Sequence, residues 1–148
     1  MKVDVYIEIE KGSNIKYEFD KSTNKLVIDR ILPEHYYPYA YGFIENTRAS
    51  DGDELDALII THNNFKNDYI YNVYIVGVLI MEDEKGLDEK ILCMEYDFDL
   101  DDIHEEVKEE IFYFFTNYKN NSPGKWSKVY DFKNKEYAID LYNKYLSK

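Results

Sequence analysis

Apolar and polar positions alternate along the first two thirds of the chain, which is typical of β-strands with one buried face. The first strand is predicted at residues 3–10, where every second residue from Val3 to Ile9 is apolar. In the longest apolar stretch Gly77 predicts a bulge or bend, because glycine weakens a regular ladder. Residues 82–90 read as a hairpin loop. The same pattern predicts further strands at residues 15–19, 26–32, 57–61, 69–81 and 90–96.

The last third of the chain changes to a helical period. Asp102 and Glu105 predict a capping box at the start of a first helix. Residues 125–132 predict one more strand, and Asn134 is the predicted N-cap of a final helix. One face of the first helix collects Val107, Ile111, Phe114, Phe115 and Tyr118. The stripe of the final helix consists of Ala138, Leu141, Tyr142, Tyr145 and Leu146.

Closely spaced strands followed by two helices predict an α+β fold that is mainly β, a small closed sheet with flanking helices. No repeat, low-complexity tract or linker interrupts the chain, so residues 1–148 are expected to form a single domain.

Charge and cysteine content narrow the classes of function. The formal net charge of -12 argues against nucleic acid or an anionic membrane as a partner, since both would be repelled. No run is long enough to span a membrane, and the N-terminus lacks the apolar segment of a signal peptide. Cys93 is the only cysteine, and it lies in an apolar run that predicts a buried, inert thiol. A reducing, cytoplasmic location is therefore expected.

The segment 51–56 concentrates the candidate chemistry, because Asp51, Asp53 and Asp56 lie within six residues and Gly52 lets the chain curl. Two carboxylates about 4 Å apart repel by roughly 4 kcal/mol at an effective dielectric near 20. Such a group requires a cation or must spread into solvent. All-oxygen ligands favour Mg²⁺, Mn²⁺ or Ca²⁺ over zinc. Taken alone, the segment is more often an acidic surface turn.

An EF-hand calcium loop does not fit this segment. Counted from Asp51, its fifth and sixth places hold Leu55 and Asp56, where a ligand and a glycine are required. The twelfth place holds His62 instead of glutamate.

A second acidic group, at residues 82–90, favours the functional reading over the surface turn. Cations also occur in strand or loop contexts, at Lys16, Arg30, Lys119 and Lys125. An enzyme that acts on phosphates with Mg²⁺ needs this mixture. Carboxylates hold the ions, while Lys, Arg and tyrosine hydroxyls bind phosphoryl oxygens.

Because of these residues and their order, the chain resembles the family I soluble inorganic pyrophosphatases from about Val5 to the last helix. The most specific match is the segment 51–57, which fits that family's D-x-D-x-x-D signature. Supporting matches follow in the family's order, at residues 7–9, 15–18, 29–30, 37–43, 83 with 88 and 90, 114–119 and 124–126.

The resemblance implies a five-stranded OB-like closed barrel with helices outside and the hydrolysis of pyrophosphate to two phosphates. It implies that Asp51, Asp56 and Asp88 hold a first metal and that Asp56 also reaches a second. Asp83, with Asp88 and Glu8, would receive the metals that arrive with the substrate. Mg²⁺ is the expected cofactor, with Mn²⁺ as a substitute and Ca²⁺ as an inhibitor.

The resemblance also assigns the remaining roles. Asp53 would be the general base that orients or deprotonates the attacking water, and Lys90 would neutralise the leaving phosphate or the carboxylates. The resemblance implies that Lys16 and Arg30 are catalytic as well. The phosphates would be bound by Lys16, Arg30, Tyr41, Tyr118 and Lys119. Supports behind the site would be Glu18, Tyr37 and Lys125.

The bacterial relatives imply a homo-oligomer, a hexamer, although Tyr113 and Asn117 stand where their helix often carries histidines. Two other functions stay open. One is a metal- or phosphate-binding module without catalysis, and the other is an OB-fold nucleic-acid binder, which would need a basic groove.

Overall fold

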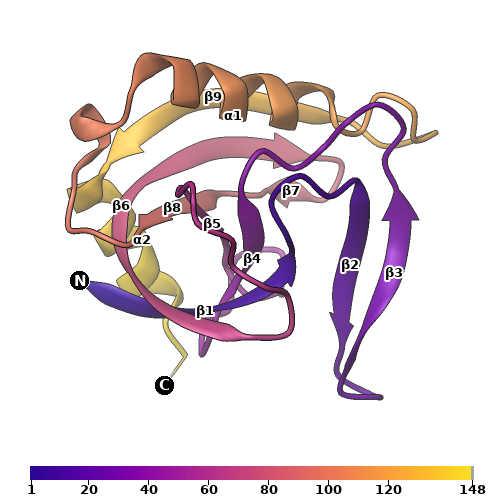
Figure 1. Ribbon diagram of the computed structural model, residues 1–148, viewed down its shortest axis with the longest axis horizontal. Coiled ribbons are helices and arrows are strands. Elements are labelled where there is room, and N and C mark those ends of the chain that lie inside the picture. Colours follow the sequence, from indigo (N-terminus) through magenta and orange to yellow (C-terminus); the bar gives the residue numbers. More distant parts are fainter. Residues whose placement is uncertain (148) are drawn as a thin grey trace.

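Five strands pair in a ring in the computed structural model, which describes residues 1–147. β1 (Lys2–Ile9) pairs antiparallel with both β4 (Ala40–Ile44) and β6 (Ile70–Asp83). β5 (Asp56–Ile59) joins β4 antiparallel to β8 (Lys90–Met94) parallel, and β8 pairs antiparallel with β6. Each of these strands therefore has two neighbours within the ring, and Figure 1 shows them curving around one interior.

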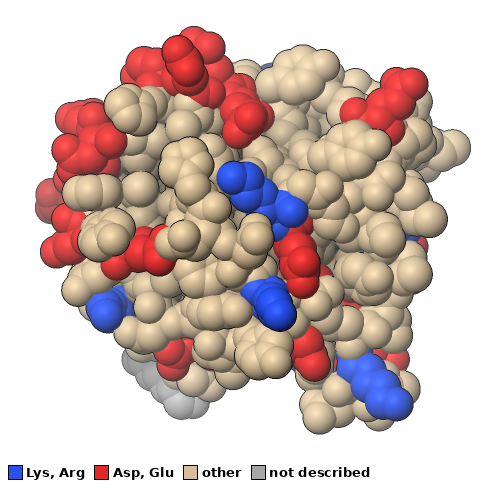
Figure 2. Space-filling view, in the orientation of Figure 1, with Lys and Arg blue, Asp and Glu red and all other residues tan. Residues whose placement is uncertain are grey.

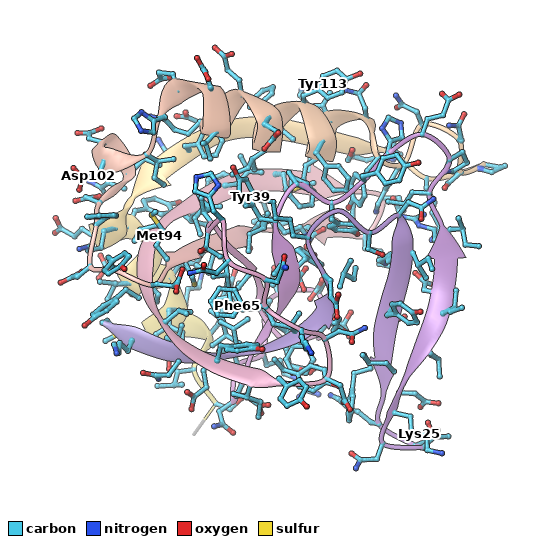
Figure 3. The ribbon with its side chains drawn as sticks, viewed as in Figure 1. Lys25, Tyr39, Phe65, Met94, Asp102 and Tyr113 are labelled. Carbon is cyan, nitrogen blue, oxygen red and sulfur yellow. The ribbon has the colours of Figure 1, made fainter. Side chains whose placement is uncertain are left out.

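A separate hairpin of β2 (Ile15–Asp20) and β3 (Lys25–Ile31) stands beside this ring (Figure 1). Lys25 marks its tip in Figure 3. The register shifts after Lys16, so that Asp29 is the extra residue on β3. This bulge lies next to the paired Lys16 and Arg30.

The remaining elements cover the long strand β6. The short β7 (Gly86–Leu87) pairs with its end, and β9 (Ser127–Asn134) pairs along its second half. A 3-10 turn η1 (Leu100–Asp102) leads into α1 (Glu105–Asn117), which crosses the molecule beside β9 in Figure 1. The final helix is α2 (Lys135–Tyr145).

Strands β4, β5 and β8 are buried on both faces, and each face supplies a different cluster. Ala57 and Ile59 pack in the cluster that includes Ala138 and Leu141 of α2. The residue between them, Leu58, packs in the cluster of α1. This division follows from the alternation of side chains along a strand, and it places α1 and α2 against opposite faces.

Acidic side chains crowd the upper left of the face in Figure 2, near the start of α1, whereas lysines and arginines on this face are few. Asp101 and Asp102 occupy the first turn of η1, and Glu105 and Glu106 that of α1. Carboxylates there stabilise the positive end of a helix. The acidic side chains at these two helix starts are therefore explained by the stability of the helices.

Several predicted elements are confirmed. The fold is mainly β with two α-helices, and β6 has a register shift between Ile75 and Gly77. Asn134 caps α2 by accepting a hydrogen bond from Tyr137 N at 3.0 Å. Cys93 is fully buried, and burial raises the pKa of its thiol. Among the described helices, none combines the length and apolar character needed to cross a bilayer.

One prediction about local structure was wrong, one strand is shifted along the chain and one strand was missed. Asp102 does form a capping box, but with Asp99 around η1; α1 begins after His104, which makes no side-chain cap. The strand placed at residues 125–132 runs instead from 127 to 134. No strand was predicted at β4 (Ala40–Ile44), which contains Gly42. A Cβ on Gly42 would lie 1.8 Å from the Tyr6 carbonyl oxygen, so this position admits no side chain.

Candidate active site

One pocket of about 540 Å³ collects the predicted site residues between the hairpin, the ring and the loop after α1. Of these residues only Tyr37 does not line it. Carboxylates from the β4–β5 turn, β5 and the β6–β8 connection lie on the same pocket as cations from β3 and the α1–β9 loop. The predicted residues that line it are Glu8, Lys16, Glu18, Arg30, Tyr41, Asp51, Asp53, Asp56, Asp83, Asp88, Lys90, Tyr118, Lys119 and Lys125.

The aspartate segment curls back on itself, as Gly52 predicted. Gly52 has a φ of +91°, a left-handed conformation that glycine adopts without strain. Its amide donates to the Ala49 carbonyl at 3.0 Å, and the Asp53 amide donates to the Asp51 carboxylate at 3.0 Å. The turn delivers Asp56 to the first position of β5. Asp51, Asp53 and Asp56 therefore all line one pocket.

Lys90 is the buried cation at the centre of the acidic side. Its ammonium donates to Asp56 at 2.7 Å, Asp88 at 2.8 Å and the Tyr41 hydroxyl at 2.7 Å. Only 1% of the residue is exposed. Burial alone would lower the pKa of Lys90, but Asp56 and Asp88 raise it well above its usual value. Lys90 is therefore charged and holds the two aspartates together.

The carboxylates around Lys90 are crowded. Burial, with Asp56 and Glu18 nearby, raises the pKa of Glu8 to about 8, although the Phe19 amide opposes the shift. Burial also raises the pKa of Asp51 and of Asp88, and neighbouring aspartates add to both shifts. Lys90 thus compensates only part of the negative charge.

Within residues 1–147, no group of three or more His, Cys, Asp or Glu side chains is arranged to hold a metal ion. The chemistry of the donors nevertheless fits a hard divalent cation. Every ligand candidate in the pocket is an oxygen, and burial and mutual repulsion make the charged forms of several of them costly. A cation at this group would relieve that cost.

Further cations line the same pocket. Lys119 is buried and contacts Asp83 at 2.8 Å and Glu84 at 3.2 Å. Lys16 contacts Asp29 at 2.9 Å. Lys125 is exposed on the loop between α1 and β9.

Arg30 differs from the other cations because two of its three guanidinium nitrogens are unpaired. Its Nη1 donates to Ser122 Oγ at 3.1 Å, and its guanidinium carbon lies 5.8 Å from the centre of the Tyr118 ring. Nε and Nη2 are buried without a hydrogen-bond partner among the described residues. Buried donors of this kind call for an acceptor.

Tyr37 lies behind the pocket wall. It is 1% exposed, and its ring centre lies 5.3 Å from that of Tyr41 and 4.6 Å from that of Phe114. Burial raises the pKa of its hydroxyl well above the usual value. Tyr37 therefore contacts the lining residue Tyr41 without lining the pocket itself.

Glu84 and Ser122 are among the residues that contact the site and were not predicted to belong to it. Glu84 accepts hydrogen bonds from Lys119 Nζ and from the Trp126 amide, at 3.2 Å each. Glu84 lies in the acidic group at residues 82–90, but its partners follow only from tertiary packing. Ser122 lies in a polar loop and carries no signal in the sequence.

Known proteins are similar to this chain in sequence and in fold. Residues 5–148 match a family model described as inorganic pyrophosphatase. A Helicobacter pylori (strain J99) protein named inorganic pyrophosphatase is 44% identical over 150 residues, 95% of this chain and 87% of its own length. A Nanoarchaeum equitans protein with the same name is 42% identical over 148 residues, 93% of this chain and 91% of its own length.

Solved structures of inorganic pyrophosphatases are also similar to this chain. A structure of the inorganic pyrophosphatase from Helicobacter pylori superposes with a TM-score of 0.94 at 42% identity, covering 97% of this chain and 91% of that one. The inorganic pyrophosphatase from Thermus thermophilus gives a TM-score of 0.92 at 37% identity, covering 96% and 87%.

Proposed function

This chain belongs to the inorganic pyrophosphatase family, and from that premise we propose that it hydrolyses pyrophosphate to two phosphates in a Mg²⁺-dependent reaction. The single observation that carries the proposal is the pocket itself. Crowded carboxylates line it together with the cations that a phosphate substrate requires. The alternative of an OB-fold nucleic-acid binder is disfavoured by the net charge of -12.

The carboxylates divide into two metal-binding groups under this proposal. Asp51, Asp56 and Asp88 hold one ion, and Asp56 also serves a second. Asp83, Asp88 and Glu8 receive the ions that accompany pyrophosphate. A bound Mg²⁺ would polarise phosphoryl oxygens and lower the pKa of its water. Mn²⁺ would substitute for Mg²⁺, and the larger Ca²⁺ would inhibit.

Asp53 is the proposed general base. It lies on the same tight turn as Asp51, and its amide hydrogen bond to Asp51 fixes the backbone from which its carboxylate extends. A carboxylate in this position orients the attacking water and accepts its proton. Lys90 keeps Asp56 and Asp88 close together and neutralises negative charge as the phosphate leaves.

The phosphates are bound by the cations and tyrosine hydroxyls that line the same pocket. Lys16, Arg30 and Lys119 supply positive charge, and Tyr41 and Tyr118 supply hydroxyl donors. Charge-assisted hydrogen bonds of this kind are worth most where water is excluded, and Lys119 and Tyr118 are both buried. Glu18 and Lys125, which line the pocket, and Tyr37, which lies behind its wall, support these groups.

We further propose that the five-stranded ring is an OB-like closed barrel and that residues 1–148 form a single domain. A cytoplasmic location and a homo-oligomer, a hexamer as the resemblance implies, are also proposed. Tyr113 extends from the outer side of α1 in Figure 3 and is 65% exposed, so this helix has a surface for contact.

Phosphate release from pyrophosphate, measured with Mg²⁺ and with EDTA, tests the proposal. Activity should require Mg²⁺ and fall when Ca²⁺ is added. Asp53→Asn should lose roughly 100-fold or more in kcat, because a general base contributes that much, while it still binds Mg²⁺. Asp140→Asn, an exposed change on α2, is the matched control and should retain full activity.

Two outcomes would contradict the proposal. Near-normal turnover by Asp53→Asn would remove the general-base role. A protein that Mg²⁺ stabilises against heat but that releases no phosphate would instead be a metal-binding module without catalysis.

A further inference from the structure

The loop between α1 and β9 reaches across the pocket to the hairpin through one hydrogen bond. Arg30 on β3 donates from Nη1 to Ser122 Oγ at 3.1 Å, although the two residues are 92 positions apart in the chain. This contact joins the hairpin, which forms its own two-stranded sheet, to a loop that follows α1.

Two backbone hydrogen bonds fix the position of Ser122 in the loop. Its amide donates to the Lys119 carbonyl at 3.0 Å, and its carbonyl accepts from the Lys125 amide at 3.1 Å. The loop is held independently by Glu84, which accepts from Lys119 Nζ and from the Trp126 amide. The Ser122 hydroxyl is therefore presented to Arg30 by a loop that does not depend on that hydroxyl for its shape.

Arg30 has two further donors, Nε and Nη2, that are shielded from solvent and have no partner among residues 1–147. A shielded donor without a partner costs free energy, and pairing it with an anionic oxygen removes that cost. If Arg30 turned toward water instead, these donors would be hydrated. Substrate would then have to displace that water and order a flexible side chain.

We propose that Ser122 is a positioning residue for Arg30. Its hydroxyl holds one guanidinium nitrogen, so that the other two stay unhydrated and ready for phosphate oxygens of the substrate. The Tyr118 ring, 5.8 Å from the guanidinium carbon, restrains the same group by a cation–π contact. Ser122 thus strengthens substrate binding without touching the substrate.

The inference rests on the proposed function, and its test separates the two. Ser122→Ala should raise KM for pyrophosphate about tenfold, as expected for one hydrogen bond to a charged group, with kcat within about threefold. Ser122→Thr keeps the hydroxyl and should restore KM to within about twofold. Asn121→Ala, an exposed change in the same loop, should leave both constants unchanged.

A double-mutant cycle asks whether Ser122 acts through Arg30. In the Arg30→Lys background, Ser122→Ala should change KM less than twofold. An undiminished effect there, or a normal KM for Ser122→Ala, would overturn the inference. Calorimetric binding of imidodiphosphate, a pyrophosphate analogue that resists hydrolysis, should weaken by the same factor in Ser122→Ala. This measurement decides the role of Ser122 even if the wild-type protein released no phosphate.

Discussion

Lys90 on β8 lies opposite Asp56 on β5 in parallel register, and its ammonium nitrogen lies 2.7 Å from that carboxylate. Because the two strands are parallel, both begin at the same edge of the sheet. Asp56 and Lys90 are the first residues of their strands, so the two charges meet at that edge, where both residues line the pocket. The second carboxylate, Asp88, comes from the connection just before β8, at 2.8 Å. One ammonium thus balances two aspartates that are both proposed to bind metal.

Lys90→Met should destabilise the metal-free protein by roughly 3 kcal/mol, because it leaves two partly buried carboxylates without their cation. Added Mg²⁺ should restore part of this loss by binding the same carboxylates. Urea unfolding in EDTA and in Mg²⁺ measures both effects. Lys133→Met removes an exposed strand ion pair with Asp131 and should cost less than about 1 kcal/mol. Equal losses in the two variants would show that Lys90 does not hold the site together.

Gly42→Ala tests the close approach of β1 and β4. The added Cβ would lie 1.8 Å from the Tyr6 carbonyl oxygen, which is backbone and cannot move aside cheaply. We expect a loss of about 3 kcal/mol or more, or failure to fold. Gly12→Ala meets no atom within 4 Å and should cost only about 1–2 kcal/mol, from its φ of +84°. Chemical denaturation compares the two, and similar losses would contradict the steric argument.

Residues whose signal is local could be predicted from the sequence. The alternation in β1, the bulge at Gly77 and the cap at Asn134 each depend on neighbours along the chain. The aspartate turn belongs to the same group, because Gly52 and the spacing of the aspartates are visible in one short segment. The second acidic group and the family resemblance then linked that turn to distant cations.

Features set by tertiary contacts could not be predicted. The strand β4 was missed, and the need for glycine at position 42 arises only because β1 passes so closely. Asp102 was assigned to the wrong helix start, because the sequence does not show that a 3-10 turn precedes α1. Ser122 had no signal at all, since its partner Arg30 lies on a hairpin that only the fold brings near.

Asn134→Ala should destabilise the protein by about 1 kcal/mol. The Asn134 side chain accepts a hydrogen bond from the Tyr137 amide at 3.0 Å, and alanine would leave that amide without this partner. Asn143→Ala, at an exposed position in the last turn of the same helix, should be neutral or slightly stabilising, because alanine is the better helix former. Thermal or urea unfolding checks the pair. The cap assignment fails if the two variants are equally stable.

Ionisation of the Tyr39 hydroxyl should lower the free energy of unfolding at alkaline pH. Burial, together with the charge and hydrogen bond of Glu110, raises the pKa of Tyr39 to about 12, against about 10 in the unfolded chain. The unfolded state therefore loses this proton first, so stability is intact below pH 10 and falls as the pH rises toward 12. Between pH 9 and pH 11, the free energy of unfolding should decrease by about 1 kcal/mol less in Tyr39→Phe than in the wild type, as measured by urea unfolding. Tyr113→Phe, at a tyrosine that is 65% exposed, is the matched surface control. An identical pH profile for the wild type and Tyr39→Phe would show that the Tyr39 hydroxyl does not titrate with unfolding.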